Sequence, residues 1–170
     1  LPYFPKNSDI TGVGTITQML LAKGTDVKTI EQVRRLWDGP LLVKGVMSVA
    51  DAKLARSAGA QGLVLSNHGG RQSESLVAPL QALPRVREAV GDALTLGVDS
   101  GIRSGLDVAR ALALGADFTL LGRAFMFAVA ALGEAGAEHA TEILKIELEQ
   151  AMGQIGCFEL PHLARFLAAG

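Results

Sequence analysis

The sequence predicts an α/β fold that forms half of a (β/α)8 TIM barrel, with parallel strands and surrounding helices. Short apolar segments, suited to strands buried on both faces of a sheet, alternate with segments of helical period. The order strand, loop, helix, loop, strand also recurs at a constant spacing within the chain. A complete barrel needs about 250 residues, whereas this chain has 170 residues and four expected strands.

The expected elements follow one another along the chain. A helix is expected over residues 26–37, because Ile30, Val33 and Trp37 share one face and Pro40 prevents its continuation. The apolar runs predict strands over residues 41–44, 62–66, 94–99 and 118–122. The other helices are expected over residues 48–58, 77–90, 104–114 and 137–153, with a shorter one over 16–23.

An internal repeat relates two parts of the chain at an offset of 56 residues. Residues 44–51 align without a gap with residues 100–107, and each copy places a serine three residues before an aspartate at a helix start. In this arrangement the hydroxyl can accept a hydrogen bond from a free backbone N–H of the first turn. Each copy then ends its helix at a glycine, Gly59 or Gly115, and continues into a strand. Such a repeat is typical of a (β/α) barrel.

Composition excludes several classes of protein. The chain has 16 basic and 17 acidic residues and a net charge of −1, which argues against a nucleic-acid partner. A single cysteine, Cys157, rules out an intrachain disulfide framework and is interpreted as a small buried apolar residue. Apolar runs stay below the roughly 18 residues of a membrane span.

The start of the chain and its strand number indicate an incomplete protein. Leu1 replaces an initiator methionine and no signal-peptide pattern follows it, so we expect an internal cut. We divide the chain into residues 1–40, a variable loop and helix, and residues 41–170, a half barrel with C-terminal helices. An open half barrel would expose an apolar edge, so we expect its other half from missing sequence, another chain or self-association.

Polar side chains gather where the expected strands end, which is the edge at which barrel enzymes carry their chemistry. The four strands run, in order, into Lys44-Gly45, Ser66-Asn67-His68-Gly69-Gly70-Arg71-Gln72, Asp99-Ser100-Gly101-Ile102-Arg103 and Gly122-Arg123. The last two segments suit a phosphate, because barrels often bind one after strands 7 and 8 at a helix N-terminus. The run from Ser100 to Gly105 can offer backbone N–H groups, and Gly122 and Arg123 add close approach and a cation.

Three of these residues suit catalysis or substrate binding. His68 can carry a proton near neutral pH, and Arg71 can hold a carboxylate through two parallel hydrogen bonds. Lys44 can place a fixed cation beside an electron-rich group. Their structural alternatives are a hydrogen-bonded loop histidine, a surface ion pair of Arg71 with Glu74, and a buried ion pair of Lys44 with Asp99.

Together these motifs resemble the FMN-dependent α-hydroxy-acid dehydrogenase/oxidase family, which includes L-lactate dehydrogenase, (S)-mandelate dehydrogenase and glycolate oxidase. The resemblance runs from about residue 41 to residue 163, and the segment from Ser66 to Gln72 is its most specific part. It implies that the four strands are strands 5–8, the C-terminal half of the barrel. It also implies FMN as cofactor and the oxidation of a small L-2-hydroxy acid, similar to L-lactate, to the 2-oxo acid.

The resemblance further implies roles for individual residues. His68 is the implied base and also contacts the substrate, whose carboxylate Arg71 binds. Lys44 is implied to stabilise reduced flavin, and Ser66 to touch its ring, while the later segments hold ribityl and phosphate. The implied FMN-binding residues are therefore Lys44, Ser66, Asp99, Ser100, Gly101, Ile102, Arg103, Gly122 and Arg123.

The chain departs from the family pattern in two respects. The family motif usually continues Arg-Gln-Leu-Asp, whereas Ser73-Glu74 follow Gln72 here. The family's substrate-binding tyrosines, a flavin-binding glutamine and threonine, and the aspartate that pairs with the histidine lie on earlier strands. We therefore expect the chain alone to be inactive and to bind FMN weakly if at all.

Two other interpretations remain beside this one. The first is a different phosphate-binding barrel, similar to IMP dehydrogenase or isopentenyl-diphosphate isomerase, and the run from His68 to Arg71 argues against it. The second is a non-catalytic half-barrel assembly module, and the intact residues Lys44, His68, Arg71 and Arg103 argue against it. The resemblance also implies a homo-oligomer, a tetramer, that is cytoplasmic or peripheral to the inner membrane.

Overall fold

Four parallel strands form one sheet in the order β1-β2-β3-β4, so every strand pairs with its neighbour in sequence. A computed structural model describes residues 24–72 and 75–167 of the chain. The helix expected over residues 16–23 lies outside the described residues. The strands are β1 (Leu42–Val46), β2 (Gly62–Leu65), β3 (Thr95–Val98) and β4 (Phe118–Thr119).

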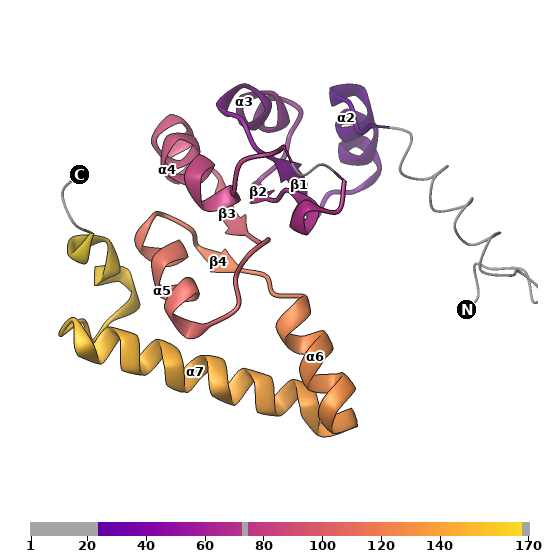
Figure 1. Cartoon of the computed structure of the whole chain (residues 1–170). Helices are drawn as coiled ribbons and strands as arrows, with labels where there is room; N and C mark the ends of the chain where they lie inside the picture. Colours follow the sequence, from indigo (N-terminus) through magenta and orange to yellow (C-terminus); the bar gives the residue numbers. More distant parts are fainter. Residues whose placement is uncertain (1–23, 73–74, 168–170) are drawn as a thin grey trace, which may run out of the picture.

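Helices separate and surround these strands (Figure 1). They are α2 (Val27–Leu36), α3 (Val49–Ser57), α4 (Pro79–Val90), α5 (Gly105–Ala113), α6 (Arg123–Leu132) and α7 (Gly136–Gln154). A 3-10 helix over Leu160–Phe166 follows α7 and packs against α5. This architecture confirms the predicted α/β class and the parallel half barrel. None of the described helices is both long and apolar enough to cross a membrane.

The central strands β2 and β3 form the middle of the core. Leu63 and Leu65 of β2, Leu96 and Val98 of β3 and Leu83 of α4 are fully enclosed. Burial of each such side chain stabilises the fold by about 1.5–3 kcal/mol relative to exposure. Because both faces of these strands are covered, their sequences are continuously apolar, which is the pattern that predicted them.

The predicted repeat is visible in the backbone. Ser48 caps α3 and Ser104 caps α5 in the same way, each hydroxyl accepting the amide of the aspartate three residues later. Gly59 and Gly115 end the two helices with φ of 94° and 104°, in the left-handed region that glycine adopts without strain. The offset of 56 residues therefore reflects two copies of one structural unit.

Two arginines fix the opposite ends of the strands in the same repeated manner. Arg87 of α4 donates hydrogen bonds to the carbonyls of Gly91 and Gly115 and forms an ion pair of 2.6 Å with Asp117. Arg34 of α2 likewise bonds the Gly39 carbonyl and the side chain of Gln61, which is 56 residues before Asp117. Sequence reasoning missed both arginines, because their partners are loop carbonyls and side chains that follow no periodic pattern in the sequence.

Two strand ends differ from expectation by more than one residue. β4 is shorter than the predicted range 118–122, because after Leu120, whose amide bonds the Val98 carbonyl at 2.8 Å, the chain turns into α6. β1 extends beyond the predicted residue 44 to Val46 through a bulge at Gly45, where the register with β2 shifts and φ is 97°. The bulge absorbs one extra residue at the carboxyl end of the strand.

Helix α6 is apolar yet contains no buried residue. Met126, Phe127, Val129 and Leu132 are 48–64% exposed. Figure 1 shows α6 leaving the sheet after β4 and meeting α7 at its far end, so only part of its surface is covered. Exposed apolar side chains of this kind are suited to packing against further protein.

We predict that Gly105→Ala destabilises the chain by about 1–3 kcal/mol, the usual cost of overpacking. A Cβ at Gly105 would collide with the backbone of α7 at Leu144, Glu147 and Leu148. Urea unfolding of the purified chain measures the change. The matched control is Gly153→Ala in α7, where an added Cβ meets nothing within 4 Å. Equal stability of the two variants would contradict the close packing of α5 on α7.

Candidate functional site

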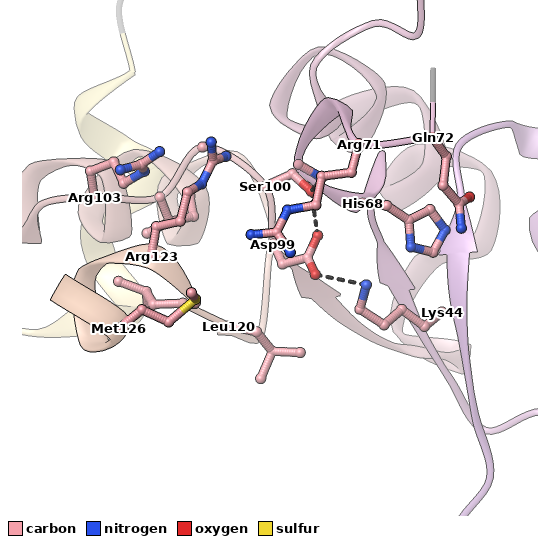
Figure 2. Close-up of a pocket in the computed structure, with 15 residues that line it drawn as sticks. Lys44, His68, Arg71, Gln72, Asp99, Ser100, Arg103, Leu120, Arg123 and Met126 are labelled. Carbon is pink, nitrogen blue, oxygen red and sulfur yellow. Dashed lines mark hydrogen bonds and ion pairs between the residues drawn. The ribbon is translucent and has the colours of Figure 1, made fainter. Parts of the chain in front are cut away.

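A cavity of about 490 Å³ opens at the carboxyl ends of the four strands. Every site residue predicted from the sequence lines it, except Ser66, which is buried directly beneath. Figure 2 shows Arg103 and Arg123 beside the start of α6, and Lys44, His68 and Gln72 across the cavity from them. The lining residues that the sequence predicted are Lys44, His68, Arg71, Asp99, Ser100, Gly101, Ile102, Arg103, Gly122 and Arg123.

A polar cluster joins the ends of three neighbouring strands beside this cavity. The ammonium of Lys44 lies 2.8 Å from the carboxylate of Asp99 and donates to the hydroxyl of Ser66 at 2.8 Å. The structural alternative for Lys44, an ion pair with Asp99, is therefore present. It does not exclude a functional role, because the Lys44 side chain stays 44% exposed and lines the cavity.

Asp99 is held in its charged form. Burial alone would raise the pKa of its carboxyl, but hydrogen bonds from Lys44, Ser100 and Ser66, together with the charge of Lys44, outweigh burial. The pKa of Asp99 consequently lies below the ordinary aspartate value. At neutral pH the cluster is thus a carboxylate paired with an ammonium rather than two neutral groups.

His68 lies in a strained turn at the edge of the cavity. It begins a short 3-10 helix, His68–Gly70, with φ of 56°, and its amide donates to the Ser66 hydroxyl at 3.1 Å. Its imidazole packs over Gly45, where an added Cβ would lie 3.2 Å from Nε2. Within the described part of the chain the imidazole makes no hydrogen bond. The ring is therefore positioned by packing and backbone contacts and is open to a ligand.

The opposite end of the cavity suits an anion. Neither Arg103 nor Arg123 has an ion-pair partner among the described residues, and both line the cavity. Helix α6 begins here at Gly122 without a side-chain cap, so its first N–H groups remain available. A Cβ at Gly69 would lie 3.2 Å from Arg123, so the His68 turn reaches this end as well.

The first amides of the neighbouring helix α5 are already hydrogen-bonded and cannot bind an anion. This finding corrects the expectation that the whole run from Ser100 to Gly105 offers free N–H groups. The Asp107 carboxylate accepts from the amides of Arg103 and Ser104, and the Glu147 carboxylate accepts from the amide of Gly105 at 2.8 Å. Of the predicted run of N–H groups from Ser100 to Gly105, only the first three donate to no other described group. The backbone elements that remain available to an anion are therefore residues 100–102 and the start of α6.

The donor set fits the FMN that the resemblance implies. A phosphate would meet two guanidinium groups, free amides and an uncapped helix, which are the features that bind phosphate in proteins. The remaining cavity has a volume in the usual range for cofactor sites, about 300–1,000 Å³. Lys44 provides a cation at the far end.

Several residues that shape the site were not predicted as site residues. Gly45 leaves the space that the His68 imidazole fills. The lining is completed by Gly69, Gln72, Leu120, Leu121 and Met126. Gly45 was detectable, because the repeat aligns it with Gly101, and both have φ near 100°. The apolar lining residues carry no pattern that distinguishes them from core residues. Glu74, the alternative partner of Arg71, lies outside the described residues.

We predict that acid destabilises the chain in part through Asp99. Because its pKa is lowered in the folded state, its contribution is complete above the ordinary value near 4 and is lost as pH falls through the lower folded value. Asp99→Asn should therefore be less stable than the original chain at pH 7. Its free energy of unfolding should also fall less than that of the original chain as the pH is lowered from about 5 to about 3. Urea unfolding at several pH values measures this, with the exposed Asp38→Asn as control. Parallel pH curves for both variants would contradict the prediction.

Comparisons with known proteins agree with this geometry. The family model described as FMN-dependent dehydrogenase matches residues 4–168. An L-lactate dehydrogenase of Vibrio cholerae is 48% identical over 138 residues, covering 81% of this chain and 36% of that protein. An L-lactate dehydrogenase of Pseudomonas aeruginosa is 49% identical over 125 residues, covering 74% and 33% respectively. The chain thus spans about a third of the length of these curated relatives.

Solved structures of mandelate oxidase contain the fold of this chain. A crystal structure of mandelate oxidase with benzoyl-formic acid has a TM-score of 0.79 and 42% sequence identity, covering 83% of this chain and 42% of that chain. A second, with 3,3-difluoro-2-hydroxy-3-phenylpropionic acid, has the same TM-score and identity. The four-stranded sheet is therefore part of a larger barrel in these proteins. Because the family model covers nearly the whole sequence, the chain belongs to the FMN-dependent dehydrogenase family.

Proposed function

We propose that this chain supplies the FMN-binding half of an enzyme that oxidises a small L-2-hydroxy acid to the 2-oxo acid. L-lactate is the proposed substrate, since the curated relatives at 48–49% identity are L-lactate dehydrogenases. The observation that carries the proposal is a single cavity that is lined by phosphate-type donors as well as by Lys44, His68 and Arg71.

The proposed chemistry assigns one task to each of three side chains. FMN, when bound, supplies the electron sink that oxidation of a hydroxy acid needs. Arg71 holds the substrate carboxylate by paired charged hydrogen bonds. His68 accepts a proton from the substrate, and its imidazole has no competing hydrogen bond within the described residues. Lys44 lines the cavity, and its ammonium would stabilise the negative charge that a bound cofactor gains on reduction.

Asp99 tunes the position of Lys44 in this scheme. A free lysine side chain would spread over many rotamers, whereas the 2.8 Å pair with Asp99 and the bond to Ser66 fix the ammonium. Ser66 itself is 1% exposed, so its hydroxyl acts on the site through Lys44 and the His68 amide. Preorganised charge of this kind needs no rearrangement during reaction.

We further propose that the site is completed by a second half barrel, from the same gene or another chain. β1 and β4 each pair with only one strand of the described chain, and α6 leaves its apolar side chains exposed. A strand edge and an apolar helix in one place are suited to a packing partner. The chain alone is therefore expected to be inactive, and the predicted homo-oligomer would assemble only from completed barrels.

A complementation experiment tests the proposal. The chain is mixed with the preceding portion of the Vibrio cholerae L-lactate dehydrogenase, FMN is added, and flavin absorbance is followed without oxygen. L-lactate should bleach the flavin in the mixture, and D-lactate should not. The chain alone should show no bleaching. Bleaching by (S)-mandelate but not L-lactate would reassign the substrate, and bleaching by neither would refute the proposed oxidation.

We predict that Gly45→Ala lowers kcat of the complemented enzyme by roughly 10- to 100-fold, since small displacements of a catalytic group have effects of this size. The added methyl group would press on the His68 imidazole at 3.2 Å. Steady-state kinetics measure the change, while flavin absorbance checks that FMN is retained. Gly156→Ala is the matched control, because its φ of 71° imposes similar strain away from the cavity. Equal kcat values for the two variants would contradict the role of Gly45.

A further inference from the structure

We propose that Ser100 is a positioning residue for His68, and that its hydroxyl links the anion-binding loop to the turn that carries the base. Two non-glycine residues in the described part of the chain have positive φ: His68 at 56° and Ser100 at 66°. Each conformation costs free energy for a residue with a Cβ. Their occurrence together, on adjacent strand ends, indicates that one set of contacts maintains both.

Those contacts are hydrogen bonds from two consecutive amides. The His68 amide donates to Ser66 Oγ at 3.1 Å. The Gly69 amide is shared between two acceptors, Ser100 Oγ at 2.9 Å and Asn67 Oδ1 at 3.1 Å. The two hydroxyl oxygens lie 3.5 Å apart. Two serines that follow neighbouring strands thus hold the first peptide groups of the turn by hydrogen bonds. These bonds fix the backbone of His68, from which the imidazole side chain extends.

The orientation of the Ser100 hydroxyl is set by Asp99. Ser100 Oγ donates to Asp99 Oδ1 at 2.6 Å, while Asp99 Oδ2 pairs with Lys44. Because a hydroxyl has one proton and two acceptor sites, donating to the carboxylate directs its lone pairs towards the Gly69 amide. A hydrogen bond to a charged acceptor is also stronger than a neutral one. The Lys44–Asp99 pair is therefore linked through the Ser100 hydroxyl to the turn that carries His68.

Glycine would adopt the Ser100 backbone conformation without strain. The presence of serine there is explained if the hydroxyl has a use that outweighs the strain. The backbone of residues 100–102 also faces the proposed phosphate site with free amides. An anion bound to those amides acts on the same residue whose side chain holds Gly69. Anion binding at the phosphate site should consequently change the position of the His68 side chain.

The test compares Ser100→Ala with Ser100→Gly in the full chain. If the hydroxyl only offsets backbone strain, Ser100→Gly removes the strain as well and should behave like the original chain. If the hydroxyl positions the turn, the His68 side chain should lose its fixed position in both variants. The matched control is Ser57→Ala, because the Ser57 hydroxyl donates to the Leu54 carbonyl on the exposed face of α3.

NMR of chain labelled at histidine nitrogen provides the readout. The chain contains three histidines, so His139 and His162 serve as internal references. We expect the His68 side-chain signal to shift in both Ser100 variants, while the two reference signals stay in place. A His68 signal unchanged in both variants, or restored in Ser100→Gly, would overturn the proposal.

A second measurement tests the link to the anion. Inorganic phosphate is titrated into the original chain and into Ser100→Gly. Phosphate should move the His68 signal in the original chain and move it less in the variant; equal movement in both would overturn the link. The role of His68 as base rests on the proposed function, but the ligand-free spectra need neither substrate nor flavin. Failure of L-lactate oxidation is therefore distinguishable from failure of this inference.

Discussion

The ion pair between Lys44 and Asp99 is the interaction on which the functional edge of this protein depends. It spans from β1 to β3, and the hydroxyl of Ser66 on β2 accepts from Lys44 between them. Three parallel strands are thereby tied where their carboxyl ends meet. A charged pair in partial burial is costly unless its hydrogen bonds are satisfied, and here Ser66 and Ser100 satisfy them. The same two serines also accept hydrogen bonds from the amides of His68 and Gly69.

The two ends of each strand serve different purposes. At the carboxyl ends, glycines, arginines and strained turns leave a cavity open to ligands. At the other ends, Arg34 and Arg87 bind carbonyls and side chains of the next repeat unit, which fixes the strands. This division is general for barrels, where one face carries chemistry and the other stability. The repeat preserved the capping serines and helix-ending glycines in both copies, while the residues at the site diverged.

The distribution of helix caps decides where a phosphate can bind. Both α5 and α6 start at the cavity edge, and both follow glycine-containing loops. Asp107 and Glu147 satisfy the first amides of α5, while α6 begins without a side-chain cap. A negative ligand is favoured only at the second, because the carboxylates of the first would repel it. Glu147 belongs to α7, so this preference arises from packing between distant segments.

The sequence by itself determined the alternation of strands and helices, the repeat, and the identity of the polar residues at the strand ends. These follow from local rules: apolar runs favour buried strands, serine caps helices, and glycine ends them. Only the tertiary structure decided that the N-terminal amides of α5 are unavailable to an anion, that β4 stops after two residues, and that Gly45 makes room for His68. The arginine contacts at the opposite strand ends belong to this second group. Each depends on which backbone and side-chain atoms meet across the fold, and such contacts between distant residues leave no periodic signal in the chain.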